Sequence, residues 1–267
     1  MVHDGKVAIV TGGGRGLGRA MALGLSRTGF RVAITAARRR DEIEAVAREA
    51  PPGRIYPVMA DVSSESACAA LIKEVEVRLG PPDVLVNNAG RGMRYVSERF
   101  LSEPSRFWET APETWRMIIA TNVNGPFFAS RAVTPGMIAR GWGRIINISM
   151  NHETMRRRGF SPYGPSKAAL ESETIIWAQD LAGTGVTVNA LLPGGASLTG
   201  MIPDEVPVEL RAKLISPEIM VPPLLWLVSG SADQVTGRRF NASRWDTNLA
   251  PDEAAVKAFE PAGWGGS

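Results

Sequence analysis

The 267-residue sequence predicts an α/β fold in which one doubly wound parallel sheet is covered by helices on both faces. Three observations lead to this class. Short apolar runs alternate with longer stretches of helical periodicity. Each run is apolar almost throughout, as expected for a strand that is buried on both faces. Successive runs are separated by helix-length crossovers, which parallel neighbours require.

Six strands and five helical stretches are expected in order along the chain. The strands are VAIVT (7–11), RVAIT (31–35), RIYPVMA (54–60), VLVNN (84–88), RIINIS (144–149) and VTVNALLP (186–193). The helices are 16–28, 41–49, 64–79, 113–139 and 163–182. No repeat or linker divides the chain, so we expect one domain over residues 1–247 and a Pro/Gly-rich C-terminal tail over 248–267.

Composition and charge argue against several classes of function. The formal net charge of +3 is a weak argument for nucleic-acid binding. No apolar run is long enough to span a bilayer or to act as a secretion signal. The two histidines and one cysteine are widely scattered, so no metal site is expected. Cys68 has no partner for an internal disulfide, and we expect a reducing cytoplasm.

A strand, a glycine turn and a helix follow one another in VAIVTGGGRGLGRAMALGL (7–25). Gly12 permits a tight turn, Gly16 lets the backbone approach a pyrophosphate, and Gly18 allows close packing of helix on strand. The free N–H groups and the positive dipole end of the helix would then face the pyrophosphate. In this context the glycines predict a dinucleotide site.

The spacing T-G-x-x-x-G-x-G, Thr11 to Gly18, resembles the short-chain dehydrogenase/reductase family. Further motifs of that family follow in order: Asp61-Val62, NNAG (87–90), Asn122 in IIATNVNGPF, Tyr163-x-x-x-Lys167, Pro193-Gly194 and VTG (235–237). The resemblance covers about residues 5 to 240. It implies a Rossmann-type domain and an NAD(P)-dependent oxidoreductase that acts on a secondary alcohol or ketone.

The resemblance also implies which residues contact the cofactor. They are Gly12, Arg15, Gly16, Leu17, Gly18, Arg38, Asp61, Val62, Asn88, Ala89, Gly90, Tyr163, Lys167, Pro193, Gly194 and Thr199. NAD-binding sheets often end the second strand with an acidic residue, but this chain has Ala36 there, followed by Ala37 and three arginines. Guanidinium groups suit a 2′-phosphate, so we predict NADP, with NAD as the alternative.

Tyr163 and Lys167 project from one face of a helix because they are four residues apart. A free phenol has a pKa of about 10, and an ammonium beside it, with the positive nicotinamide nearby, should lower that pKa. By resemblance, Tyr163 is the acid/base that protonates a carbonyl oxygen. Lys167 tunes it and holds the nicotinamide ribose, and Asn122 helps to position a water in the proton relay.

The family's serine, thirteen residues before the tyrosine, falls on Met150, whose thioether cannot donate a hydrogen bond. Ser149 after a shift of the loop, the amide of Asn151, or His152 could replace it. We favour Ser149, because a loop at a strand end rotates at modest cost. Met150 also raises an alternative function, a nucleotide-binding regulator or sensor whose catalytic apparatus has lapsed.

By the same resemblance, three segments line the substrate pocket: 91–112, 150–162 and the stretch after Pro193-Gly194. The first carries Met93, Tyr95, Phe107 and Trp108, which favour an apolar or aromatic substrate. Arg156-Arg157-Arg158 in the second could hold a carboxylate or phosphate.

The helix 163–182 is apolar on more than one side, which predicts a second covering layer. In related proteins that layer is another subunit, so we expect a homodimer or homotetramer. A small carbonyl or alcohol substrate is the other expected partner, with no nucleic acid and no membrane.

Overall fold

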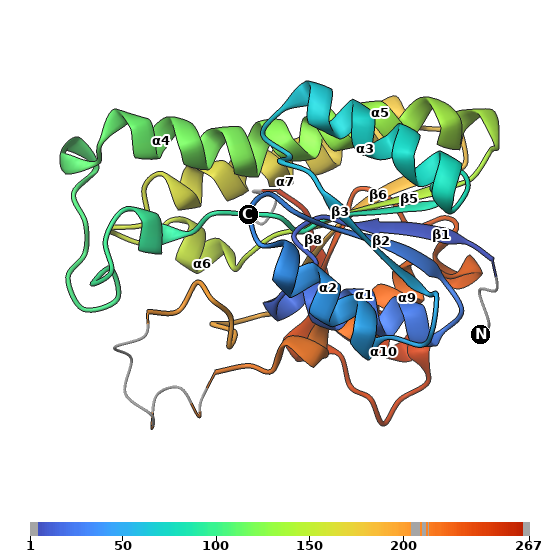
Figure 1. Cartoon of the computed structure of the whole chain (residues 1–267). Helices are drawn as coiled ribbons and strands as arrows, with labels where there is room; N and C mark the ends of the chain where they lie inside the picture. The colour runs from blue at the N-terminus through green and yellow to red at the C-terminus, as the bar shows by residue number, and fades with distance from the viewer. Residues whose placement is uncertain (1–4, 204–208, 210–211, 213, 264–267) are drawn as a thin grey trace.

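Eight strands form one sheet in the order β3-β2-β1-β4-β5-β6-β7-β8, in which only β8 is antiparallel to its neighbour (Figure 1). The computed structural model describes residues 5–203, 209, 212 and 214–263. The strands are Val7–Val10, Arg31–Ala36, Ile55–Met59, Val84–Asn87, Gly143–Ile148, Val186–Leu192, Arg238–Asn241 and Phe259–Pro261 for β1 to β8. The strand order reverses between β1 and β4, which is where open α/β sheets bind ligands. The predicted α/β class is confirmed.

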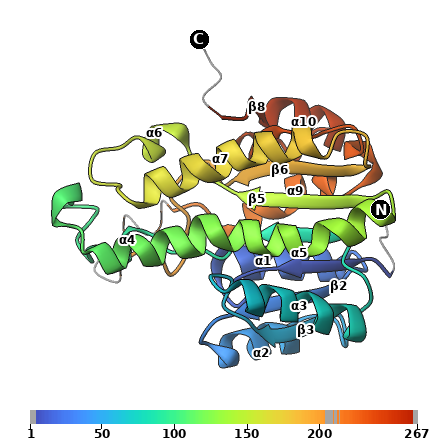
Figure 2. The ribbon, with the colours of Figure 1, turned by 90° about the horizontal axis from the view of Figure 1, so that it is seen from above.

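Helices cover both faces of this sheet, as Figures 1 and 2 show. One face carries α3 (Glu65–Arg78), α4 (Pro112–Ile119), α5 (Gly125–Ala139) and α7 (Tyr163–Asp180). The other carries α1 (Gly16–Arg27), α2 (Arg40–Glu49), α9 (Val221–Leu227) and α10 (Pro251–Ala258). The short helix α6 (His152–Met155) lies between β5 and α7 in the chain.

Two apolar layers form the core because alternate side chains of each strand point to opposite faces. Val7 and Ile9 of β1 pack in the layer that includes α3 and α5, whereas Ala8 and Val10 pack in the layer that includes α1 and α9. All four side chains are almost completely buried. Continuous apolar strands are therefore necessary here, as the sequence pattern indicated.

The six predicted strands all exist, with ends within one residue of the expected positions. The predicted helix 113–139 is instead two helices, α4 and α5, joined by a π-helical turn at Ala120–Asn124 (η3). The C-terminal region has elements that we did not predict, namely α9, α10 and β8. Residues 251–261 of the expected tail therefore form a helix and an edge strand of the sheet.

Within the described part of the chain, no helix is long and apolar enough to cross a membrane. Across those same residues, no group of three or more metal-ligating side chains could hold an ion. Cys68 is buried, and burial raises the pKa of its thiol to about 11.

Candidate active site

One cavity of about 840 Å³ lies at the carboxyl ends of the strands and includes every residue that the sequence predicted to contact the cofactor. It is bordered by the glycine turn, the end of β2, the NNAG segment, the start of α7 and the residues after β6. These segments are far apart in the sequence. The parallel sheet brings them together because its strands all end at the same edge.

The glycine turn has the backbone conformation that its residue types predict. Gly12 and Gly16 have φ angles of 64° and 53°, in the region that favours glycine. A Cβ on Gly18 would lie 2.3 Å from the carbonyl oxygen of Gly12, so only glycine fits there. Arg15 precedes α1 in an extended conformation and makes no side-chain cap. The first N–H groups of α1 therefore have no side-chain acceptor from the N-cap residue, which suits anion binding.

Side-chain hydrogen bonds hold the NNAG segment against this turn. The Thr11 hydroxyl accepts from the backbone N–H groups of Asn88 and Ala89, both at 3.0 Å. The Asn88 amide donates to the carbonyl oxygens of Thr11 at 2.8 Å and Gly12 at 3.0 Å. The Asn88 side chain thus fixes the shape of the turn in addition to lining the cavity.

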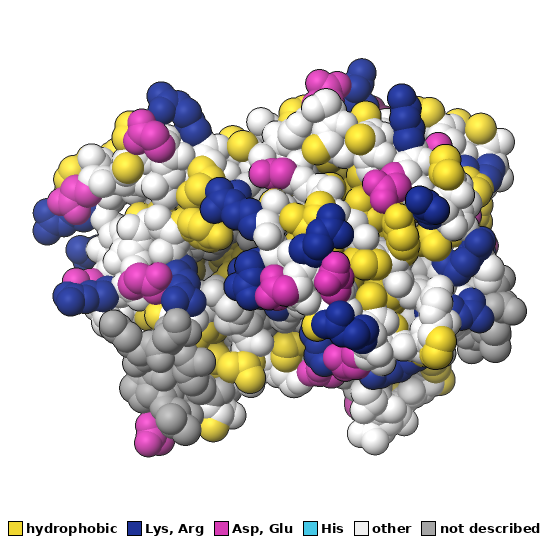
Figure 3. All heavy atoms as spheres, in the orientation of Figure 1, with side chains coloured by type: hydrophobic (Ala, Val, Ile, Leu, Met, Phe, Trp, Pro, Cys, Tyr) yellow, Lys and Arg dark blue, Asp and Glu magenta, His cyan; other side chains and the backbone are white. Residues whose placement is uncertain are grey.

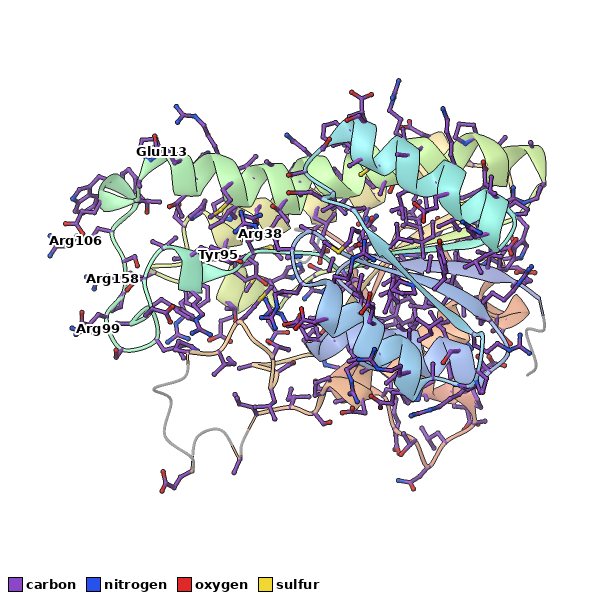
Figure 4. The ribbon with its side chains drawn as sticks, in the orientation of Figure 1. Arg38, Tyr95, Arg99, Arg106, Glu113 and Arg158 are labelled. Carbon is purple, nitrogen blue, oxygen red and sulfur yellow. The ribbon has the colours of Figure 1, made fainter. Side chains whose placement is uncertain are left out.

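Among the arginines near the end of β2, Arg38 differs from its neighbours. Arg39 pairs with Asp41 at 2.7 Å and with Glu42 at 3.4 Å, and Arg15 lies 3.8 Å from Glu42. Arg38 lines the cavity and makes no ion pair within the described residues. Figure 4 places it in the middle of the view, beside the label of Tyr95. Its guanidinium is therefore available to an anion at this end of the cavity.

Tyr163 and Lys167 lie together at the first turns of α7, as their spacing predicted. The Lys167 ammonium donates to the carbonyl oxygen of Ile148 at 2.7 Å and lies 6.0 Å from the centre of the Tyr163 ring. The Tyr163 hydroxyl contacts the Met201 thioether, with 4.0 Å between oxygen and sulfur. The sequence carried no signal for Met201, which approaches from the segment after β6.

The pKa of Tyr163 differs from our expectation. We expected Lys167, with the positive nicotinamide nearby, to lower it; in this structure burial raises the pKa of Tyr163 to about 12. Burial also lowers the pKa of Lys167 to about 8, and the Glu171 carboxylate partly offsets this effect. The physical reason is that desolvation penalises both charged forms, while the ammonium donates to a backbone carbonyl rather than to the phenol. At neutral pH the tyrosine is therefore protonated.

Asn122 lies in the π-helical turn and is completely buried. Its side-chain oxygen accepts from the N–H of Arg91 at 2.8 Å, and its amide donates to the Arg91 carbonyl at 2.9 Å and to Ser166 at 3.0 Å. The side chain therefore fastens the segment after β4 to α7 and does not line the cavity. Pro126 has no N–H to donate to the Asn122 carbonyl four residues earlier.

The loop after β5 places Met150 where a hydroxyl was expected by resemblance. The side chains of Met150 and Tyr163 both pack against a buried apolar cluster. The Ser149 hydroxyl donates to the buried carboxylate of Glu171. Ser149 lines the cavity, but its hydroxyl would have to leave Glu171 to serve a substrate oxygen. The role that we assigned to Ser149 stays a prediction.

The structure also shows the surroundings of Asn151 and His152, the two alternatives to Ser149. The Asn151 amide donates to the carbonyl oxygen of Gly194 at 2.8 Å, which ties this loop to the segment after β6. Burial, followed by the charge of Arg239, lowers the pKa of His152, so the imidazole is neutral at pH 7. Asn151 lines the cavity, whereas His152 does not.

The far end of the cavity is apolar with a basic border. Met93, Phe100 and Phe160 form a buried cluster, in which the two rings meet edge to face at 5.9 Å between centres. Arg157 lies over the Phe160 ring at 5.5 Å from its centre, and Arg91 and Arg94 also line the cavity. Figure 3 shows Lys and Arg side chains across the middle of this face, with Asp and Glu among them.

Some expected pocket residues lie outside this cavity. Phe107 and Trp108 are 68% and 66% exposed and do not line it, which corrects our expectation for them. They belong to the short helix Phe107–Glu109, which has no buried residue. Of the arginine triplet, Arg157 lines the cavity, whereas Arg158 lies with Arg99 and Arg106 at the outer edge of the molecule (Figure 4).

The sequence is similar to known dehydrogenases and reductases. The family model described as short chain dehydrogenase matches residues 6–207. The acetoacetyl-CoA reductase of Rhizobium meliloti is 34% identical over 247 residues, which are 89% of this chain and 97% of that protein. A 3-oxoacyl-[acyl-carrier-protein] reductase of Staphylococcus epidermidis is 35% identical over 191 residues, covering 71% of this chain and 74% of that protein.

Solved structures are similar over most of the chain. A variant of actinorhodin polyketide ketoreductase with NADPH has a TM-score of 0.78 and 29% identity, covering 90% of this chain and 97% of that one. A protein from Beutenbergia cavernae, assigned as an NAD(P)-dependent gluconate 5-dehydrogenase with bound NADP, has a TM-score of 0.77 and 29% identity, covering 90% and 96%.

Proposed function

The chain belongs to the short-chain dehydrogenase family and is an NAD(P)-dependent oxidoreductase, and we propose that it reduces a 3-oxoacyl thioester with NADPH. One observation carries this proposal. The protonated, half-buried side chain of Tyr163 and the glycine turn of a dinucleotide site border the same cavity. A proton donor and a hydride carrier are the two components that ketone reduction requires.

The residues present fit a phosphorylated dinucleotide. Gly12, Gly16 and the start of α1 form a cradle without side chains, in which backbone N–H groups would hold the pyrophosphate. Arg38 and Arg15 would hold the 2′-phosphate, since β2 ends without a carboxylate. Two solved relatives hold NADPH or NADP, in agreement with NADP as the cofactor. When bound, it supplies the hydride that reduces the ketone carbon.

We assign the proton to Tyr163 and the electrostatic support to Lys167. As the ketone carbon is reduced, Tyr163 gives its hydroxyl proton to the ketone oxygen and becomes a phenolate. Lys167 stays close enough to favour that phenolate, because the carbonyl of Ile148 anchors its ammonium. Asn122 keeps the segment after β4 in register with α7 through bonds to Arg91 and Ser166.

The substrate class rests on the far end of the cavity and on the relatives. The apolar cluster of Met93, Phe100 and Phe160 suits a short acyl group. Arg157, which lies over the Phe160 ring, suits the phosphates of a carrier such as coenzyme A. Several relatives that cover most of the chain are acetoacetyl-CoA reductases.

Self-association is part of the proposal. Phe127 and Ile138 of α5, Ile176 of α7 and Trp115 of α4 are large apolar side chains that are 42 to 51% exposed. These helices lie side by side on the outside of the molecule (Figure 2). A second copy covering this face would give the homodimer or homotetramer expected from the sequence. Light scattering of the wild type and of Phe127→Glu tests this, and a monomeric wild type would contradict it.

The test of function is reduction of acetoacetyl-CoA, followed by loss of NADPH absorbance. We expect turnover in the wild type and a loss of about a hundredfold or more in Tyr163→Phe, which lacks only the proton donor. The NADPH affinity of that variant should be nearly unchanged, because the ring still packs. Ethyl acetoacetate serves as a carrier-free control.

The outcomes separate the parts of the proposal. Equal efficiency with ethyl acetoacetate would remove the thioester carrier from the proposal. Comparable turnover in Tyr163→Phe would remove this tyrosine as the acid. Tight NADPH binding without reduction of any ketone would favour the alternative that Met150 raised, a nucleotide-binding regulator or sensor.

A further inference from the structure

A cluster of buried charges lies directly behind the Met150 loop. Arg239 of β7 and Glu171 of α7 are each only 1% exposed and are joined at 2.6 Å. A second guanidinium nitrogen of Arg239 donates to the backbone carbonyl of Met150 at 2.9 Å. Glu171 in turn accepts the hydroxyl of Ser149. Two successive residues of the loop are therefore held by one buried ion pair.

The C-terminal strand completes this cluster. Glu260 of β8 accepts from the third nitrogen of Arg239 at 2.8 Å, and the N–H of Gly263 donates to Glu171 at 3.3 Å. All three nitrogens of the guanidinium thus have an acceptor: Glu260, Glu171 and Met150. A lysine could not make these three bonds in one plane, because only the guanidinium has a rigid planar set of donors.

Stability alone is a weak reason for such a cluster. Removing charges from water is costly, and a buried ion pair often stabilises a protein no more than apolar residues of the same size. In this protein one arm of the cluster is directed at the backbone of Met150, whose side chain packs against the same apolar cluster, Met93, Phe100 and Phe160, as Tyr163 does. The geometry therefore connects the edge of the sheet with the wall of the catalytic cavity.

We propose that Arg239 is a positioning residue that fixes the Met150 loop beside Tyr163, and that β8 is required to hold Arg239 in place. The effect of this positioning on catalysis rests on the proposed function, reduction of a ketone. Placement of this loop matters because a displacement of about 1 Å near reacting groups can lower a rate about a hundredfold. The C-terminal residues 259–263 then help to position the active-site loop, although they do not line the cavity.

Arg144 provides a matched control. It is a second buried arginine on a strand, β5, and it pairs with Asp233. It does not line the cavity, and it lies at the amino-terminal end of its strand, whereas the cavity is at the carboxyl ends. Arg239→Met and Arg144→Met each remove a buried guanidinium; the first leaves two carboxylates, the buried Glu171 and the largely buried Glu260, and the second leaves Asp233, which is half exposed. Only the first also releases Met150.

The experiment compares these variants with Glu260→Gln and Arg239→Lys in two measurements. Hydrogen exchange of the peptide 149–155 reports the loop directly. Single-turnover reduction of acetoacetyl-CoA at saturating NADPH reports placement without product release. For Arg239→Met we expect faster exchange, a rate lower by about ten- to a hundredfold, and an NADPH Kd within about twofold of the wild type.

The other variants should lower the single-turnover rate less than Arg239→Met does. Arg239→Lys should recover part of the rate, and Glu260→Gln should show a smaller loss of the same kind. Arg144→Met should lower Tm yet keep the wild-type exchange in 149–155 and the wild-type rate. Wild-type exchange and rate in Arg239→Met would overturn the inference, as would equal effects of Arg239→Met and Arg144→Met.

Two further outcomes keep the test decisive. If Arg239→Met does not fold, Glu260→Gln decides: faster exchange in 149–155 supports the inference, and wild-type exchange overturns it. If the wild type reduces no ketone, the proposed function fails, while the exchange measurement still determines whether Arg239 holds the loop.

Discussion

Replacing Arg38 by alanine should weaken NADPH binding while leaving NADH binding almost unchanged. Arg38 is exposed at the cavity and makes no ion pair within 4.0 Å among the described residues, although its charge acts on Asp61, so its donors are available to a 2′-phosphate. A hydrogen bond to a charged group contributes about 1.5–3 kcal/mol, and the lower end applies at an exposed site. A loss of about 1.5 kcal/mol is roughly a tenfold increase in Kd.

The assay is fluorescence titration of both cofactors against Arg38→Ala, Arg39→Ala and Arg40→Ala. Arg39 already pairs with Asp41 and Glu42, so its loss should raise the NADPH Kd by less than about threefold. Arg40 pairs with Glu44 and does not line the cavity, so Arg40→Ala is a control for the lost charge.

Three results would refute this reasoning. Equal weakening of NADPH and NADH by Arg38→Ala would mean that the residue does not distinguish the 2′-phosphate. A larger effect of Arg39→Ala would mean that its ion pairs do not hold it away from the cofactor. Tighter binding of NADH than of NADPH by the wild type would remove the argument from the missing acid at the end of β2.

Three further predictions concern single side chains. Ser149→Ala should lower the free energy of unfolding, measured by urea denaturation, by about 1 kcal/mol, because Glu171 then has one hydrogen-bond donor fewer. A fall in kcat of about a hundredfold at unchanged stability would instead make Ser149 the substrate contact. Met150→Ser should raise the single-turnover rate, because a hydroxyl can donate to the ketone oxygen and a thioether cannot; an unchanged rate would show that this position does not face the ketone oxygen. Burial raises the pKa of Glu173 to about 7, above its unfolded value, so its favourable contribution to stability is present at low pH and is lost as pH rises through 7. The stability advantage of Glu173→Gln should therefore grow between about pH 4.5 and 7, by up to roughly 3 kcal/mol, and a constant difference would contradict this.

Local patterns were sufficient for most of the fold. The strands could be located because a doubly covered sheet requires continuous apolar runs; β1 and β6 begin at the predicted residues and end one residue earlier than predicted. The π-helical turn at Ala120–Asn124 was missed because periodicity does not register one additional residue in a turn. The strand β8 was missed because three residues carry no pattern, and β8 forms only by pairing with β7.

The sequence by itself determined the glycine turn and the Tyr163–Lys167 pair. Both depend on the backbone within a few residues: glycine is needed where φ is positive, and a helix places side chains four residues apart on one face. The contacts around them were decided by the tertiary structure. Ser149 meets Glu171 across 22 residues and Arg239 meets Met150 across 89, and no local pattern encodes such pairs. The direction of the Tyr163 pKa shift was decided in the same way, because it follows from burial, which depends on all the segments that pack around the phenol.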